Sequence, residues 1–516
     1  MKEILEFIKS IPWWAWPIAI LAIIAFRDRF LNRAHTVTRN FPVIGHFRYM
    51  FEKIGPEIRQ YFIANNREEL PFNRSQRSWI YASSKKENNY QGFGTDQDQH
   101  EPNFIFIKPA MFPYKIDGEH PNSRDPYFLP CAKVIGPQRA KPYRPYSVIN
   151  VSAMSFGSLS AAAINALNEG SKMAGNYHNT GEGGLSPYHS KGADVCFHFG
   201  TGYFGVRNKE DGTFSMDKMK ELTANNPFVK TIELKLSQGA KPGKGGVLPA
   251  KKITKEIAEI RGVEMNKDVL SPANHSAFDS IPTMVQFIED IANETGLPVG
   301  IKSAVGKLEM WEKLADEMIR TGNGPDFITI DGGEGGTGAA PPAFADHVAL
   351  PWVYAFTSVY RLFSQKGLAD KIVWKGSGKL GLPAKAIMAY AMGVDVINVG
   401  REAMLSIGCI QAQLCHTNHC PSGVATQKSW YQGGIDVTLK SERFGNYVKT
   451  LRKEMAELTR ACGYEHPCQI TMEDIDIGMG DNNYTKSLRE NYNYEKEAVP
   501  FTGMQALKDC DYLGGK

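Results

Sequence analysis

Downstream of residue 148 the chain alternates short β-branched or apolar runs with segments of helical spacing. These runs lie at residues 148–154, 176–180, 195–200, 231–237, 298–304, 327–332, 371–377 and 396–400. Near-continuous apolar runs are typical of parallel strands that are buried on both faces. Segments between them, such as 159–174 and 383–393, repeat apolar residues with a helical period. Eight such units, with glycines after the strand ends, predict an α/β fold, a (β/α)8 TIM-type barrel; a doubly wound sheet would give similar local signals.

The N-terminus has a different pattern. Residues 11–26 are uncharged, slightly fewer than the roughly 20 that a membrane-spanning helix needs. Tryptophans, which suit a membrane interface, lie at Trp13, Trp14 and Trp16. Basic residues follow at Arg27, Arg29 and Arg33 and favour a cytoplasmic C-terminal side. We predict an uncleaved single-pass membrane anchor with a cytoplasmic catalytic domain; a cleavable signal peptide or a buried amphipathic helix are the alternatives.

Composition narrows the class of protein. The 516 residues suffice for one large core or two ordinary ones, and 42% hydrophobic with 22% charged residues is typical of a globular protein. A net charge of +4, without a basic stripe, gives no reason to expect nucleic-acid binding. We predict an anchor at 1–30, an extension packing on the barrel at 31–130, the barrel at 131–450 with a special loop at 408–428, and a C-terminal cap at 451–516.

That loop carries the most informative chemistry. It contains three cysteines within a short stretch, Cys409, Cys415 and Cys420, with Pro421 directly after the last. Thiolates select iron–sulfur clusters, zinc or copper. A structural zinc ion takes four ligands and would have to recruit His416 or His419, whereas a three-iron cluster needs only three cysteines.

The cysteine loop also belongs to a set of motifs in a fixed order. The others are SAMSFGS at 152–158, NTGEGG at 179–184, KLSQGAKPGKGG at 235–246, SPANHSAFDSI at 271–281 and DGGEGGTGAAP at 331–341. Over roughly residues 130 to 440 the chain resembles the synthase domain of glutamate synthase. The resemblance implies FMN and a 3Fe–4S cluster held by the three cysteines. It departs in lacking an amidotransferase domain, so ammonia is expected to come free or from another subunit.

Glycines after the seventh and eighth predicted strands suggest a phosphate site. The residues are Gly376, Gly378, Gly400 and Arg401. Unhindered backbone amides can approach a phosphate there, a helix N-terminus adds its dipole, and arginine supplies a bidentate cation. Tight turns with a solvated arginine are the alternative. The resemblance assigns this phosphate to FMN.

Other residues are expected around the flavin ring. In the family, the block after the first strand lies against the ring; here it is Ser152, Ala153, Met154 and Ser155. Asp331, Gly332 and Gly333 are expected to help seat it. A lysine in a barrel strand is costly unless paired, so Lys302 or Lys235 is expected either to offset the charge of reduced flavin or to form a structural ion pair. The 333–338 glycine spacing is not a Rossmann fingerprint, and no nicotinamide site is predicted.

Substrate contacts are expected at the same mouth. The resemblance implies that Glu182 lies near the substrate, and Lys235 and Gln238 join it as catalytic candidates. Lys241 and Arg261 resemble the positions that hold the two carboxylates of 2-oxoglutarate, a ligand that needs two separated cations; Arg261 could equally be a solvated helix residue. Val247 replaces a family glutamine and removes a polar contact to the oxoacid.

The resemblance implies an oxidoreductase acting on CH–NH2 groups. It would reduce 2-iminoglutarate, formed from 2-oxoglutarate and ammonia, to L-glutamate, with electrons from a donor such as ferredoxin or a reductase subunit. Two alternatives remain. One is a related flavoenzyme acting on another amino or imino acid such as N-methylglutamate, and the other is a membrane-linked electron-transfer subunit.

Overall fold

The computed structural model describes residues 11–32, 34–87, 90–115, 127–480 and 484–494. The chain divides into two compact units, Met1–Arg77 and Ser78–Lys516. The larger unit holds the barrel and every candidate site residue. The domain limits expected from the sequence remain predictions.

The first unit does not contain the membrane anchor that the sequence led us to expect. Its helices are α2 (Ala15–Phe26), a π-helical turn (Arg27–Leu31), α3 (Thr36–Asn40) and α4 (Gly45–Ile58), followed by a second π-helical turn at Arg59–Ile63. At 1.5 Å per residue the 12 residues of α2 extend about 18 Å, against about 30 Å of bilayer hydrocarbon. No helix among the described residues is long and apolar enough to cross a membrane. The predicted anchor and membrane localisation are therefore wrong; residues 1–10 of the predicted segment lie outside the described ranges.

The charged residues that follow α2 are one reason why no long apolar helix forms here. Asp28 is fully buried, accepts a hydrogen bond from the Val43 amide at 3.0 Å, and lies 2.8 Å from His46 Nε2. The Val43 amide lowers the pKa of Asp28, burial opposes that effect, and His46 adds to the lowering. A charged residue held by contacts to α4 and the turn before it ends the apolar stretch at Phe26.

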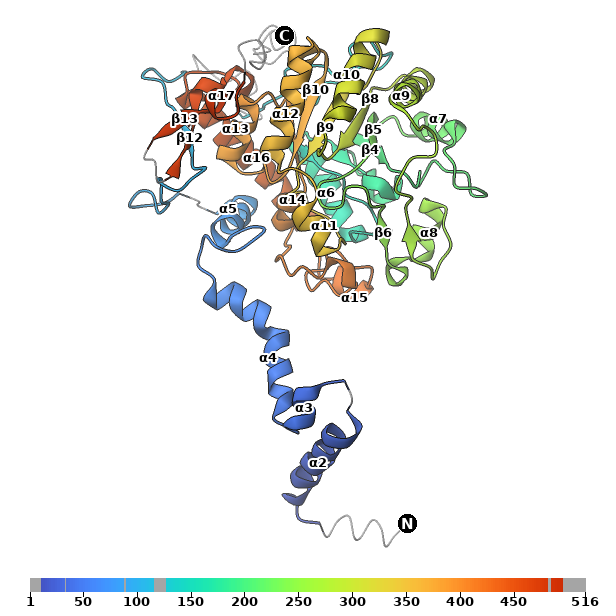
Figure 1. Cartoon of the computed structure of the whole chain (residues 1–516), viewed down its shortest axis with the longest axis vertical. Helices are drawn as coiled ribbons and strands as arrows, with labels where there is room; N and C mark the ends of the chain where they lie inside the picture. The colour runs from blue at the N-terminus through green and yellow to red at the C-terminus, as the bar shows by residue number, and fades with distance from the viewer. Residues whose placement is uncertain (1–10, 33, 88–89, 116–126, 481–483, 495–516) are drawn as a thin grey trace. The chain divides into compact units, whose positions relative to one another are not determined.

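The second unit is a closed barrel of eight parallel strands (Figure 1), and the predicted fold is confirmed. Its strands are β2 (Ile149–Val151), β3 (His178–Asn179), β4 (Val195–Phe199), β5 (Val229–Lys235), β8 (Val299–Ser303), β9 (Phe327–Asp331), β10 (Val373–Ser377) and β11 (Val396–Val399). Around the barrel they are ordered β2-β3-β4-β5-β8-β9-β10-β11, with β11 pairing to β2 through Ile397 and Ile149. Each predicted run overlaps one strand, and β5 begins two residues before its run.

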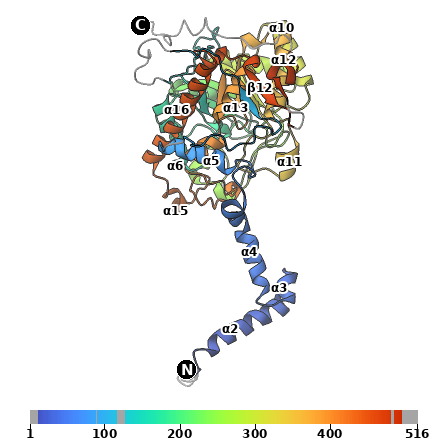
Figure 2. The ribbon, with the colours of Figure 1, turned by 90° about the vertical axis from the view of Figure 1, so that its left-hand side faces the viewer.

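Helices cover the outside of the barrel. They are α6 (Ala161–Ala174), α7 (Met216–Asn225), α9 (Ile281–Thr295), α10 (Glu309–Thr321), α11 (Pro342–His347), α12 (Trp352–Gln365), α13 (Pro383–Ala391), α14 (Arg401–Ser406) and α16 (Val437–Ala461). Figure 2 shows α6 and α16 on the same flank of the unit. They touch where Gly170 packs against the Ser441 carbonyl, a position at which an added Cβ would lie only 2.5 Å from that oxygen.

Two connections carry inserted structure toward the mouth. Between β5 and β8 the chain forms the antiparallel pair β6 (Val247–Leu248) and β7 (Val269–Leu270), with a 3-10 turn at Ala250–Lys252 and helix α8 (Lys255–Arg261) between them. After β11 the chain forms α14, the cysteine loop and the short helix α15 (Ser429–Gln432) before α16. These two insertions position the substrate and cluster candidates.

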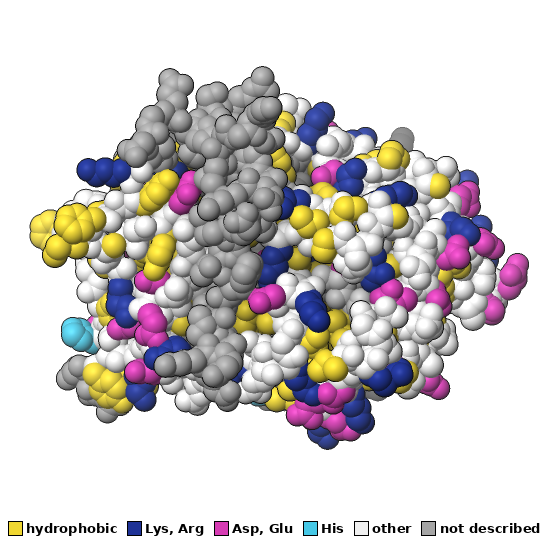
Figure 3. Space-filling view, turned by 90° about the horizontal axis from the view of Figure 1, so that it is seen from above, with side chains coloured by type: hydrophobic (Ala, Val, Ile, Leu, Met, Phe, Trp, Pro, Cys, Tyr) yellow, Lys and Arg dark blue, Asp and Glu magenta, His cyan; other side chains and the backbone are white. Residues whose placement is uncertain are grey.

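The remaining elements lie outside the barrel. They are α5 (Arg74–Lys85), β1 (Ile105–Ile107), β12 (Ile475–Gly478), β13 (Thr485–Ser487) and α17 (Leu488–Asn491). Strand β1 pairs with β12, which pairs with β13, so the chain before the barrel joins the chain after it in one small sheet. Acidic and basic side chains are interspersed over the face shown in Figure 3, in keeping with the small net charge.

Candidate active site at the barrel mouth

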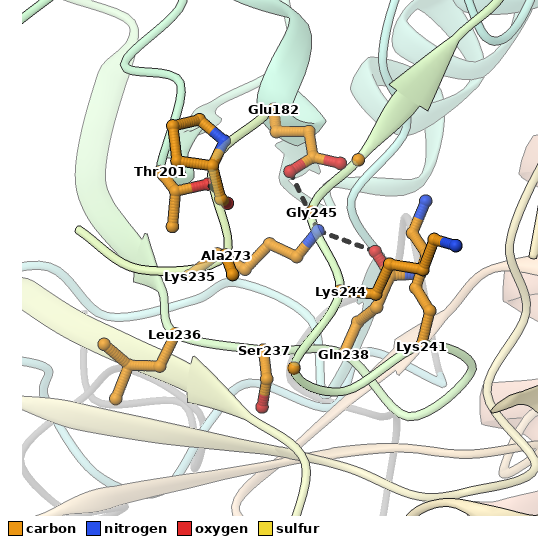
Figure 4. A pocket seen from close by; sticks show the side chains of 13 residues that line it. Glu182, Thr201, Lys235, Leu236, Ser237, Gln238, Lys241, Lys244, Gly245 and Ala273 are labelled. Carbon is orange, nitrogen blue, oxygen red and sulfur yellow. Dashed lines mark hydrogen bonds and ion pairs between the residues drawn. The ribbon is translucent and has the colours of Figure 1, made fainter. Parts of the chain in front are cut away.

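A hollow of about 320 Å3, counting its open mouth, lies at the C-terminal ends of the strands. It is lined by Glu182, Thr201, Lys235, Leu236, Ser237, Gln238, Lys241, Gly243, Lys244, Gly245, Gly246, Pro272 and Ala273 (Figure 4). Most lining residues follow β5, and Glu182 follows β3. In barrels of this type the loops after the strands build the active site. The hollow is therefore the candidate substrate pocket.

Lys235 is the centre of this pocket. Its Nζ donates to Glu182 Oε2 at 2.8 Å and to Gln238 Oε1 at 2.6 Å (Figure 4). Burial works against ionisation of Glu182, but the charges of Lys235 and Lys241 outweigh it and lower its pKa to about 2. Glu182 is therefore a carboxylate at neutral pH, and it holds the Lys235 ammonium in place rather than carrying a proton itself.

The charge of Glu182 acts on both of the expected carboxylate-binding cations. Lys241 is buried, donates to the Ala339 carbonyl at 3.3 Å, and has its pKa lowered by burial. Arg261 is also buried, so it is not the solvated residue of the alternative reading. It donates to the Phe156 carbonyl at 3.0 Å, and its Nε has no partner in the described structure. Arg261 does not line the hollow, yet Glu182 acts on its pKa, which burial lowers to about 10.

Lys302 on β8 has a carboxylate partner. Its Nζ lies 3.6 Å from Asp331 Oδ1, while Asp331 Oδ2 accepts from the Gly239 amide at 2.8 Å. A Cβ on Gly239 would overlap the Gly332 carbonyl oxygen, so the loops after β5 and β9 touch through backbone. This contact joins the substrate pocket to the predicted flavin residues. The ion pair is the structural role that the sequence left open for Lys302.

The predicted flavin and phosphate blocks lie together. The Ser152 amide donates to the Val399 carbonyl at 2.9 Å, and a Cβ on Gly400 would lie 3.5 Å from Met154 Cε. Ala153 lies between Ser152 and Met154 in the sequence. The Ser155 hydroxyl donates to Ser158 Oγ at 2.8 Å. The ends of β2 and β11 therefore form one continuous surface.

The glycines after β9 and β10 lie on either side of Trp352. Cβ atoms on Gly332 and Gly378 would crowd the Trp352 Cβ, whereas one on Gly376 would lie 2.7 Å from Leu380. Arg401 donates to the Glu334 carbonyl and so spans from β11 to the loop after β9 that includes Gly333. Burial lowers the pKa of Arg401, and its role toward a phosphate remains a prediction.

The cysteine loop is fastened to the β2 end of the barrel. Gln427 Nε2 donates to the carbonyls of Gly157 and Leu159, at 3.1 and 2.8 Å. Asn418 donates to the Lys251 carbonyl at 2.9 Å, and the Tyr81 hydroxyl donates to the Cys409 carbonyl at 2.7 Å. The loop thus borders the predicted flavin block.

The three cysteines are free thiols that affect one another. Burial, and then Cys415 and Cys420, raise the pKa of Cys409 to about 12, although the Gln411 amide donates to its Sγ at 3.5 Å. Among the described residues no group of three or more His, Cys, Asp or Glu side chains is arranged to hold a single metal ion. The three cysteines remain the predicted ligands of a 3Fe–4S cluster.

The conserved region of glutamate synthase matches residues 120–465. The chain belongs to the glutamate synthase family. It is 40% identical to the glutamate synthase large subunit-like protein YerD of Bacillus subtilis, covering 89% of this chain and 93% of that protein. It is 33% identical to the archaeal-type glutamate synthase [NADPH] of Thermotoga neapolitana, covering 60% and 58%. It is 30% identical to the ferredoxin-dependent glutamate synthase of Pyropia yezoensis, covering 65% and 22%.

The chain is accordingly a glutamate synthase-type oxidoreductase with a closed parallel barrel. It spans little more than half of the Thermotoga enzyme and about a fifth of the Pyropia enzyme. What those whole proteins do is therefore a matter for proposal.

Within this glutamate synthase family member, His419 is not free to act as a zinc ligand. Its Nδ1 forms a hydrogen bond with the Thr417 carbonyl at 2.8 Å. Its Nε2 forms another with Lys428 Nζ at 2.7 Å. Both ring nitrogens are thus engaged. Of the two histidines that could complete a four-ligand zinc site, this leaves His416 as the candidate.

Sequence reasoning missed a polar network inside the barrel. Glu233 is fully buried on β5 and bonds His198 Nδ1 at 2.7 Å, Asn179 Nδ2 at 2.7 Å and Thr329 Oγ1 at 2.6 Å. Burial opposes its charge, but His198 and nearby lysines hold the pKa of Glu233 well below its usual range. A glutamate between Ile232 and Leu234 of a predicted barrel strand was the available signal.

Lys375 is a buried cation in the interior of the barrel. It is fully buried on β10, with Nζ 3.5 Å from the Phe327 ring centre and 4.8 Å from that of Tyr177. Burial lowers the pKa of Lys375, and aromatic faces take the place of hydrogen-bond partners. It therefore belongs to the barrel interior, one residue before Gly376.

Proposed function

We propose that the chain reduces 2-iminoglutarate, formed from 2-oxoglutarate and ammonia, to L-glutamate, with FMN and a 3Fe–4S cluster as resident groups. The observation that carries the proposal is the pocket in which Lys235 is held by Glu182 and Gln238 beside Lys241. Family membership supplies the reaction class. Ferredoxin or a reductase subunit is the proposed electron donor, and relatives named for NADPH and for ferredoxin support either choice.

The fit of FMN is supported by how the candidates divide around the barrel. The predicted flavin residues come from β8, β9, β10, β11 and β2, which are consecutive neighbours. The catalytic candidates Glu182 and Lys235 come from β3 and β5 on the remaining arc. Cβ atoms at Gly332 or Gly378 would crowd Trp352, so glycine at both positions lets the start of α12 pack closely against the ends of β9 and β10. A flavin on one arc would face a substrate on the other.

Each part of the cofactor has its proposed residues. Gly376, Gly378, Gly400 and Arg401 would hold the phosphate, Ser152 to Ser155 and Asp331 to Gly333 the ring, and Lys302 its anionic side. Cys409, Cys415 and Cys420 would hold the cluster. When bound, FMN supplies hydride transfer and the cluster supplies single electrons.

The chain's own residues bind and orient the substrate. Lys241 lines the hollow and would pair with one carboxylate of the substrate. The second carboxylate needs a separate cation, a role that the family resemblance gives to Arg261, although Arg261 does not line the hollow. An ammonium has three N–H bonds, and Lys235 uses one for Glu182 and one for Gln238. The third would donate to the substrate, and the hydrogen bond to Glu182 would hold Lys235 in position for that purpose.

The test is glutamate formation by anaerobic protein given 2-oxoglutarate, ammonium and a chemical reductant. Lys241→Met is expected to lose at least tenfold in kcat/KM for 2-oxoglutarate. Lys255→Met is the matched control, because Lys255 is exposed at the start of α8 and pairs only weakly with Glu259 at 3.9 Å. Equal activity of the two variants would contradict the pocket assignment. Normal redox titration without any turnover would favour an electron-transfer subunit instead.

A second candidate is a flavoenzyme of the same architecture acting on another amino or imino acid, such as N-methylglutamate. Val247 favours it, because it directly follows the lining residues Gly245 and Gly246 where the family has a glutamine. Val247→Gln is expected to improve turnover of 2-oxoglutarate if the chain descends from a glutamate-forming site. Oxidation of N-methylglutamate by the unaltered chain, without glutamate formation, would establish the second candidate.

A further inference from the structure

A buried cation lies against the cysteine loop. Lys252, in the 3-10 turn Ala250–Lys252, is 3% exposed. Its Nζ donates to the Ser158 carbonyl at 2.6 Å and to the Cys415 carbonyl at 3.3 Å. It therefore lies between the loop after β2, which is predicted to face the flavin, and the loop that carries the three cysteines.

The surroundings of Lys252 contain no balancing carboxylate. In the part of the chain that the structure describes, no Asp or Glu forms an ion pair with it. Its two hydrogen-bond partners are the backbone carbonyls of Ser158 and Cys415, which carry no net charge. Burying an ammonium without a counter-charge is costly, and carbonyl dipoles offset only part of that cost. The site calls for negative charge at the cysteines.

We propose that Lys252 is a positioning residue that sets the reduction potential of an iron–sulfur cluster held by Cys409, Cys415 and Cys420. This inference rests on the cluster assignment of the proposed function. It adds a residue from the β5–β8 insertion, outside the cysteine loop, to the determinants of electron transfer.

The physical reason is electrostatic. A cluster held by three thiolates is anionic, and reduction adds one further negative charge. A fixed cation in a site largely shielded from water stabilises the reduced form more than the oxidised form. Net charge and hydrogen bonding around a cluster are known determinants of its potential. Lys252 therefore makes the cluster easier to reduce.

The experiment compares neutral and charged variants of the whole protein, purified anaerobically. Lys252→Gln keeps an N–H donor and Lys252→Met keeps the length, and both remove the charge. Lys252→Arg keeps the charge, and Lys251→Gln is the matched control because the neighbouring Lys251 is exposed. Iron and sulfide per chain are measured first, and then the midpoint potential of the cluster by EPR-monitored titration.

At the potential where the unaltered cluster is half reduced, the neutral variants are expected to show at least a tenfold higher oxidised-to-reduced ratio. For a one-electron couple this corresponds to a midpoint about 59 mV lower. Lys252→Arg and Lys251→Gln are expected to stay at the original value.

Unchanged potentials in neutral variants that retain iron would overturn the inference. Loss of iron from both neutral variants would also overturn it, in favour of a purely structural lysine. Unaltered protein that binds neither iron nor sulfide would instead count against the cluster assignment itself.

Discussion

Removing the charge of Glu182 is expected to destabilise the barrel by about 3 kcal/mol at neutral pH. The pKa of this carboxyl falls from 4.5 to about 2 despite burial, because Lys235 and Lys241 stabilise the carboxylate. One pKa unit corresponds to about 1.4 kcal/mol of differential interaction, which gives the stated size. Because the folded-state pKa is the lower one, the contribution is complete above about pH 4.5 and disappears as the pH falls through about 2.

The assay is urea unfolding followed by far-UV circular dichroism at pH 7.5 and at pH 3. Glu182→Gln also leaves the Lys235 ammonium buried with only Gln238 as partner. This variant should therefore lose more free energy of unfolding than the surface control Glu259→Gln. The double variant Glu182→Gln, Lys235→Met should lose less than the two single changes together, because the removed groups interact. The reasoning is refuted if Glu182→Gln equals the control at pH 7.5, or if the losses of the two single changes simply add.

Three further changes test other parts of the site. Cys415→Ser should abolish cluster absorbance while flavin is retained; iron and sulfide at the unaltered stoichiometry would contradict the ligand assignment. Arg401→Ala should release FMN on dialysis more than tenfold faster, and unchanged flavin content would leave Arg401 as a bridge to the loop after β9. Gly239→Ala should destabilise the chain by several kcal/mol, because its Cβ overlaps the Gly332 carbonyl, whereas Gly306→Ala, with open space around it, should be neutral in thermal unfolding.

Apolar runs were enough to place the eight strands, because a strand buried on both faces leaves a continuous signal in the sequence. The same signal was misleading at the N-terminus. Hydropathy alone could not place the start of the helix at Ala15, nor the contact between Asp28 and His46 that follows its end. That contact joins residues far apart in sequence, and so it is invisible to a local pattern.

Pocket residues were predictable where they fell within one motif. Lys235, Gln238 and Lys241 lie in a single run, and the structure brings Glu182 to them from β3. Burial of Lys252 beneath the cysteine loop was not predictable, because it depends on Cys415, a residue remote in sequence. The partners of Glu233 likewise come from three other strands. Sequence spacing identifies functional residues that share one segment. Contacts between residues of different segments can be seen only in the folded barrel.

The division of the mouth has a consequence for how substrate preference can change. Strands β8 to β11 and β2 carry the proposed cofactor residues, and each pairs directly with the next, so a change there disturbs the barrel wall. The pair β6–β7, which contains Val247, is joined by its own antiparallel pairing and is inserted between β5 and β8. Substitutions in this pair can reshape the side of the pocket next to Gly246 without moving a barrel strand. Substrate preference can therefore diverge at Val247 while cofactor binding is retained.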